Sequence, residues 1–98
     1  MTGVQTCALP ISAVKKLLDE MGIYHFSPVQ NGMGRAGIPD IIGCYRGRFL
    51  GIECKAGNGK TTALQDLELE KIRQAKGFAY VVNENNIQDL KELLIWMR

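Results

Sequence analysis

The stretch IPDIIGCYRGRFLGIECK, residues 38–55, decides the fold. It holds two runs rich in apolar residues, 38–45 and 48–55, joined by the short link Arg46-Gly47. Apolar runs separated by two residues that include a glycine are typical of a β-hairpin. We expect these two antiparallel strands to form the centre of a sheet.

Upstream of the hairpin, the sequence predicts a helix, a strand and a loop. Apolar residues line one face of a helix over 12–21, with Ser12 available as its cap. Aromatic and branched residues over 23–30 favour a strand, and Pro28 indicates an edge or a bend near its end. Three glycines over 31–37 favour a loop.

Downstream, the pattern predicts helices over 62–76 and 87–97 on either side of a strand over 78–82. Thr61 or Thr62 should cap the first of these helices. Its buried stripe should include Leu64, Leu67, Ile72 and Ala75. The expected fold is therefore α/β, of order α-β-β-β-α-β-α, with a small mixed sheet flanked by helices.

Length and composition limit the function classes. A chain of 98 residues indicates one domain, and small domains often gain stability by pairing, so we expect a homodimer. No apolar run approaches the ~20 residues of a bilayer span, and the start lacks the basic region of a secretory signal, so we expect no membrane partner. Three cysteines without paired spacing favour the cytoplasm. The net charge of +2 leaves a nucleic-acid partner open.

Residues 1–11 fit poorly with the rest of the chain. They show no clear apolar periodicity, and TGVQTCALPI, residues 2–11, resembles a translated sequencing adapter joined to a truncated reading frame. We expect residues 1–11 to be a foreign or disordered leader and 12–98 to be the domain.

Asp40, Glu53 and Lys55 are the residues best placed for chemistry. Glu53 and Lys55 are two positions apart on one strand and share a face, and a tight turn brings Asp40 opposite Glu53. Two carboxylates suit Mg²⁺ or Mn²⁺, and the ammonium of Lys55 can hold a water or stabilise charge on a phosphate. The alternative is a structural role, in which Asp40 ends a strand and the other two form an exposed charge pair.

Three motifs together carry a resemblance to a known family. They are G-I-P-D at residues 37–40, I-E-C-K at residues 52–55, and Gln65. In this combination the sequence resembles the VRR-NUC family of the PD-(D/E)XK nuclease superfamily, over about residues 14–82. The resemblance implies a restriction-endonuclease-like core, metal-dependent hydrolysis of DNA phosphodiester bonds, preference for junctions or flaps, and a phage or mobile-element origin in a bacterial or phage-infected cell.

The resemblance also implies roles for single residues. Asp40, Glu53 and the backbone carbonyl of Cys54 would be the ligands of Mg²⁺ or Mn²⁺. Lys55 would be the catalytic lysine, and Gln65 a helix residue that faces the site. Together these residues would form the catalytic centre of a DNA endonuclease.

The sequence departs from the family's pattern at one point. The family places a glutamate near the start of its first helix, where it can join the metal shell. Here the corresponding place falls near Cys7, and Glu20 lies at the other end of the helix. A nuclease-fold module that binds DNA but has weakened or lost the chemistry is therefore the alternative function.

Basic residues supply further candidates. Lys60, Arg35, Arg46 and Arg48 would contact DNA phosphates, or would serve solubility alone. Residues 57–61 read G-N-G-K-T, which also suits a phosphate-binding P-loop. The P-loop rule, however, needs glycine where Cys54 stands, which makes an NTP-binding role the weakest of the three alternatives.

Overall fold

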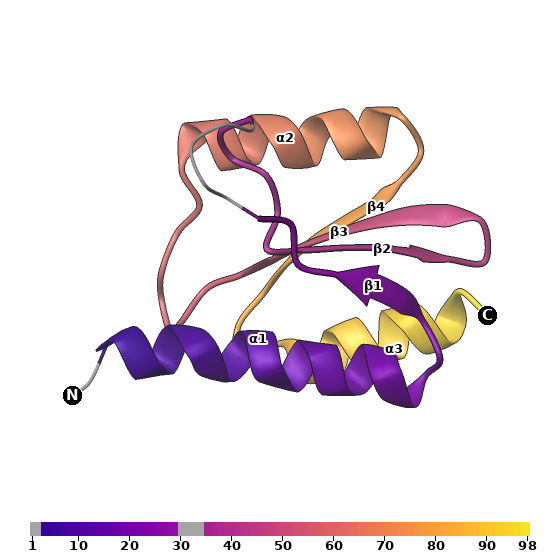
Figure 1. The fold of residues 1–98 in the computed structure, drawn as a ribbon, viewed down its shortest axis with the longest axis horizontal. Coiled ribbons are helices and arrows are strands. Elements are labelled where there is room, and N and C mark those ends of the chain that lie inside the picture. Colours follow the sequence, from indigo (N-terminus) through magenta and orange to yellow (C-terminus); the bar gives the residue numbers. More distant parts are fainter. Residues whose placement is uncertain (1–2, 30–34) are drawn as a thin grey trace.

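The computed structural model describes residues 3–29 and 35–98, with side chains from Pro10 onward. Within these residues, a four-stranded sheet lies between α2 on one face and α1 and α3 on the other (Figure 1). The element order is the predicted one. The elements are α1 (Gly3–Glu20), β1 (Tyr24–Phe26), β2 (Ile41–Tyr45), β3 (Arg48–Cys54), α2 (Ala63–Gln74), β4 (Phe78–Val82) and α3 (Ile87–Trp96).

Some predicted boundaries are wrong. Helix α1 begins at Gly3 and contains Pro10, so Ser12 lies inside it and does not cap it. Residues 3–11 lack apolar periodicity, which is why no pattern predicted the earlier start of the helix. The foreign origin of residues 1–11 stays a prediction. Strand β1 ends at Phe26, two residues before Pro28, because proline cannot donate to a strand ladder. The predicted loop lies largely outside the described residues.

The sheet is mixed, with β2 and β3 at its centre as predicted. Its order is β1-β2-β3-β4, and only the β3–β4 pair is parallel. The hairpin register pairs Ile41 with Ile52, so Arg46 and Gly47 form the two-residue turn. Both turn residues have positive φ, 55° and 81°, as this type of tight hairpin requires.

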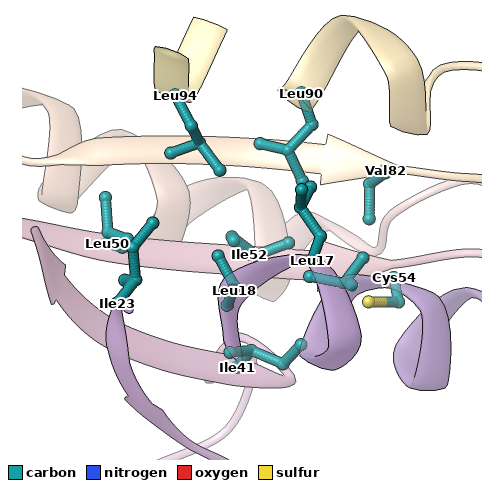
Figure 2. Packing of buried hydrophobic residues seen from close by; sticks show 11 residues of the cluster. Leu17, Leu18, Ile23, Ile41, Leu50, Ile52, Cys54, Val82, Leu90 and Leu94 are labelled. Carbon is teal, nitrogen blue, oxygen red and sulfur yellow. The ribbon is translucent and has the colours of Figure 1, made fainter. Parts of the chain in front are cut away.

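The main core fills the space between the sheet and the pair α1 and α3 (Figure 2). Leu17 and Leu18 come from α1, and Leu90 and Leu94 come from α3 (Figure 2). Alternate strand residues meet them, because side chains alternate between the two faces of a strand. The sheet contributes Ile41, Leu50, Ile52, Cys54 and Val82.

Helix α2 covers the opposite face, and its predicted stripe is partly wrong. Leu67 is 51% exposed, Leu64 and Ala75 are also exposed, and Leu69 is the fully buried leucine, at 2% exposure. Beneath α2, strand β3 presents Gly51, which has no side chain. Ile72 of α2 lies so close that a Cβ on Gly51 would be 2.5 Å from its Cδ1. The helix therefore sits close to the sheet and buries only a narrow strip.

Among the helices that the structure describes, none combines the length with the hydropathy that a membrane span needs.

Candidate metal centre

Glu53 and Lys55 face α2, on the side of the sheet away from the main core. Ile52 and Cys54 point into that core. Because side chains alternate along a strand, Glu53 and Lys55 point to the other face. Asp40 directly precedes β2, and the pairing of Ile41 with Ile52 brings it opposite Glu53. The tight hairpin thus places the two carboxylates as the sequence predicts.

Asp40 is held by the backbone of the neighbouring strand. Its Oδ2 accepts a hydrogen bond from the amide N–H of Cys54 at 2.9 Å. The Asp40 side chain thereby links the residue before β2 to the end of β3, at the peptide bond between Glu53 and Cys54. This bond fixes one oxygen of Asp40 at the site.

Glu53 is a buried carboxylate with an incomplete set of partners. It is 2% exposed, and its Oε2 lies 2.9 Å from Nε2 of Gln65 and 3.3 Å from Nζ of Lys55. Its Oε1 is buried without a hydrogen-bond partner among the described residues. Burial, followed by the negative charge of Asp40, raises the pKa of Glu53 to about 7, while Lys55 acts in the opposite direction.

Gln65 faces the site, as predicted, and also caps α2. Thr62 is the N-cap: its hydroxyl accepts from the N–H of Gln65, and its own N–H donates to Oε1 of Gln65. The other end of the same amide donates to Glu53. The start of α2 is therefore tied directly to the buried carboxylate.

The chemistry of the donor set fits a hard divalent cation. Asp40 and Glu53 lie together, and the buried, unpartnered Oε1 of Glu53 is an oxygen for which a cation would compensate. No group of three or more His, Cys, Asp or Glu side chains suited to a metal occurs in the described part of the chain. Any further ligands would be backbone carbonyls, as expected for Cys54, or waters, which Mg²⁺ commonly keeps.

The expected glutamate of the first helix is absent from this cluster. Cys7, at the corresponding place, lies within α1, but its side chain lies outside the described part of the structure. Glu20 lines a furrow between α1 and α3 together with Lys91, on the opposite side of the sheet from Glu53. Glu20 does not replace the missing ligand.

The four predicted DNA-binding residues do not form one group. Lys60 is exposed in the loop before α2, next to the site, and Arg35 pairs with Glu68 of α2 at 2.9 Å. Arg46 and Arg48 lie at the hairpin turn, at the other end of β3 (Figure 1). Five residues of strand put Arg48 about 17 Å from Glu53, and Arg46 lies beyond it in the turn. Only Lys60 and Arg35 are close neighbours of α2.

A residue that the sequence reasoning missed holds the loop before α2. Oε1 of Glu84, from the turn after β4, accepts the N–H of Gly57 at 2.8 Å. The two segments are 27 residues apart in the sequence, so no local pattern announces the contact. Glu84 thereby steadies the loop that carries Lys60.

The site brings two carboxylates together with an ammonium beside them, a donor set that a divalent cation could use. The side chain of Lys55 is one-fifth exposed, and its Nζ can contact both Glu53 and an anion. Such a combination suits hydrolysis of a phosphate ester. Comparisons of the chain with protein-family models, with curated proteins and with solved structures found no match.

Proposed function

We propose that this chain is a metal-dependent DNA endonuclease with a restriction-endonuclease-like core, similar to the VRR-NUC family. The observation that carries the proposal is the pairing of the half-buried Asp40 with the buried Glu53, with one oxygen of Glu53 left without a partner among the described residues and Lys55 beside it. A merely structural acid is normally satisfied by hydrogen bonds or exposed to water. Perturbed, partly unsatisfied carboxylates are more typical of functional sites.

Each residue has a defined part in the proposed hydrolysis. Asp40 and Glu53, with the Cys54 carbonyl, would hold Mg²⁺ or Mn²⁺, which supplies Lewis-acid polarisation of the phosphate and a more acidic water. Lys55 would stabilise the negative charge that gathers on the phosphoryl oxygens. Gln65 orients the Glu53 carboxylate through its 2.9 Å hydrogen bond.

A DNA-binding module without catalysis is the second candidate. The described residues offer no third carboxylate at the site, and Lys55 is ion-paired to Glu53 at 3.3 Å. Such a module would bind DNA with a salt-dependent affinity and without any need for metal. A P-loop role receives less support, because the N–H groups of Thr62 and Gln65 at the start of α2 are already engaged by the capping box.

The proposed setting is the cytoplasm of a bacterial or phage-infected cell, where the enzyme would act as a homodimer on DNA. Two copies would supply two sites, enough to engage two strands or a branched junction. The mass measured by light scattering at several concentrations tests the dimer. A monomeric mass throughout would remove it.

Cleavage of labelled linear, flapped and four-way-junction DNA with Mn²⁺, Mg²⁺ or EDTA tests the enzyme. Asp40→Asn and Glu53→Gln should abolish cutting, while Glu92→Gln, a matched change on exposed α3, should leave it intact. Calorimetric titration with Mn²⁺ should show binding to the native chain and to E92Q only. DNA binding without cutting, unaltered by EDTA, would favour the non-catalytic module instead.

A further inference from the structure

Helix α3 carries a second set of side chains that does not face the core. Leu90 and Leu94 point into the core and are fully buried. The second set lies on one flank of the helix, because its members are three and four residues apart. It consists of Asp89, Glu92, Leu93 and Trp96, which together line a hollow. Trp96 is 84% exposed, and it is the only tryptophan of the chain.

The turn of the β2–β3 hairpin lies at the same end of the molecule as the C-terminal end of α3 (Figure 1). Tyr45, Arg46 and Arg48 line a second hollow there, together with Trp96 and Met97. Tyr45 and Met97 pack against the core, and the two arginines are exposed. The volume of this hollow, about 220 Å³, is below the roughly 300 Å³ at which small-molecule pockets begin. The hollow therefore suits a protein side chain better than a cofactor.

Trp96 lies between groups of opposite charge. Glu92 and Asp89 precede it by four and seven residues, which puts them about 6 and 10 Å from it along the helix axis. Arg46 and Arg48 share the other hollow with Trp96, at the C-terminal end of the helix. None of these four charged side chains forms an ion pair with a residue that the structure describes. The face around Trp96 thus has an acidic half and a basic half.

Building on the homodimer proposed above, but not on the nuclease chemistry, we propose that the face around Trp96 is the dimer interface. A two-fold axis makes every contact occur twice, so a face with one acidic and one basic half is complementary to itself. The hairpin of each copy would dock on the α3 flank of the other copy. The two Trp96 side chains would lie at the centre, where tryptophan most often dominates the binding energy of an interface.

Nucleic acid fits this face less well than a second copy does. Asp89 and Glu92 carry negative charge on the same face and would repel phosphates that approach the arginines. The candidate metal centre also lies at the other end of β3, where Glu53 is about 17 Å from Arg48. Pairing through the hairpin end would therefore leave the carboxylate end of both copies uncovered. Arg48, like its neighbour in the turn, would serve pairing and not DNA binding.

The single tryptophan allows a test on the unaltered chain. Sedimentation equilibrium over a dilution series gives the mass, and the emission spectrum of Trp96 is recorded on the same samples. As the mass falls from dimer to monomer, the emission maximum should move to longer wavelength, because water replaces the apolar surface of the second copy. A fall in mass without this shift would overturn the proposed interface. A monomeric mass at every concentration would overturn both the homodimer and its interface.

Reversal of charge tests the complementarity of the two halves. Arg46→Glu with Arg48→Glu makes the face wholly acidic, and Asp89→Lys with Glu92→Lys makes it wholly basic. Each double variant alone should be monomeric, because like charges would meet across the two-fold axis. An equimolar mixture should form a heterodimer, in which both contacts again join opposite charges. Misfolded variants would not regain pairing on mixing. Double variants that still pair alone, or a mixture that stays monomeric, would overturn the proposal.

Two further variants control for charge. Lys16→Glu with Lys91→Glu changes the net charge as much as the hairpin variant does, but in the furrow between α1 and α3, and should leave the dimer intact. The neutral change Glu92→Gln keeps Asp89 and should weaken pairing about tenfold or less, since exposed ion pairs contribute little. Loss of the dimer in the furrow variant would mean that net charge, and not this face, controls pairing.

Aromatic substitutions test the centre of the interface. Trp96→Ala should weaken pairing at least about thirtyfold, the effect of removing a dominant interface residue. Tyr24→Ala removes another exposed aromatic side chain, on β1, and should leave pairing unchanged. Equal effects of the two substitutions would overturn the proposal.

The remaining outcomes separate the interface from the proposed nuclease. A dimer that responds to these variants as expected, without any cutting of DNA in Mn²⁺, would support the interface and overturn only the nuclease function. Cutting by a dimer that none of the variants weakens would overturn only the interface. A shift of Trp96 emission caused by DNA, at a concentration where the chain is monomeric, would assign this face to DNA and overturn the proposal.

Discussion

The amide of Gln65 joins the buried carboxylate of Glu53 to the N-cap of α2. Nε2 donates to Oε2 of Glu53 at 2.9 Å, and Oε1 accepts the N–H of Thr62 at 2.9 Å. One side chain therefore both starts the helix and orients an oxygen of the candidate metal centre. Helix position and site geometry are coupled through it.

Gln65→Ala should lower the free energy of unfolding by about 1 to 2 kcal/mol, since it removes half of a capping box and one hydrogen bond to a buried carboxylate. Urea unfolding measures the loss. Gln74→Ala, at the exposed far end of α2, should cost less than about 0.5 kcal/mol. Equal effects of the two substitutions would contradict the coupling.

The stability of the metal-free protein should decrease as the pH rises from about 4.5 to 7. The pKa of Glu53 is raised from 4.5 to about 7, so the folded state binds an extra proton across this window. This extra proton contributes on the order of 3 kcal/mol at most to the free energy of unfolding. The contribution is full below pH 4.5 and is lost as the pH rises through 7. Glu53→Gln should flatten this part of a stability–pH curve measured by urea unfolding, and an unchanged slope would rule out Glu53 as its source.

Asp40→Asn should lower the pKa of Glu53. The charge of Asp40 is the second-largest cause of the raised value, and asparagine removes it while its oxygen can still accept the N–H of Cys54. A carbon-detected NMR titration of the Glu53 carboxyl would show the shift. Asp40→Ala also removes the acceptor and should destabilise the fold by about 1 to 3 kcal/mol. A Glu53 pKa that stays near 7 in D40N would contradict this account.

Two glycines of the hairpin should respond differently to alanine. A Cβ on Gly43 would lie 2.5 Å from the backbone oxygen of Tyr24, which cannot move without disturbing β1. A Cβ on Gly51 would meet the flexible end of Ile72, also at 2.5 Å. Both substitutions should destabilise by about 1 to 3 kcal/mol, with Gly43→Ala the costlier. Adding Ile72→Val should rescue only Gly51→Ala, and thermal unfolding of the single and double variants checks this.

Leu69 and Leu67 should differ although both are leucines of α2. Leu69 is buried and Leu67 is half exposed, so Leu69→Ala should cost about 2 to 5 kcal/mol and Leu67→Ala less than about 1. Urea midpoints of the two variants provide the comparison. Similar losses would mean that α2 buries the predicted stripe after all.

Much of the fold could be predicted from the sequence because its signals are local. The apolar runs around Arg46-Gly47 specify the hairpin, and Thr62 with Gln65 specifies the start of α2. The hairpin register then follows from the turn and brings Asp40 opposite Glu53. For the same reason the placement of the candidate site was predictable, while its chemistry stays a proposal.

Other features depend on contacts between distant segments, and only the tertiary structure decided them. The sequence could not show which leucine of α2 is buried, because that depends on Gly51 lying beneath Ile72. Nor could it show the contact of Glu84 with Gly57, or the pairing of Arg35 with Glu68, which join residues 27 and 33 positions apart. The sequence by itself determined the elements and the hairpin register. The packing of α2 on the sheet decided the burial of Glu53, which Gln65 of that helix contacts.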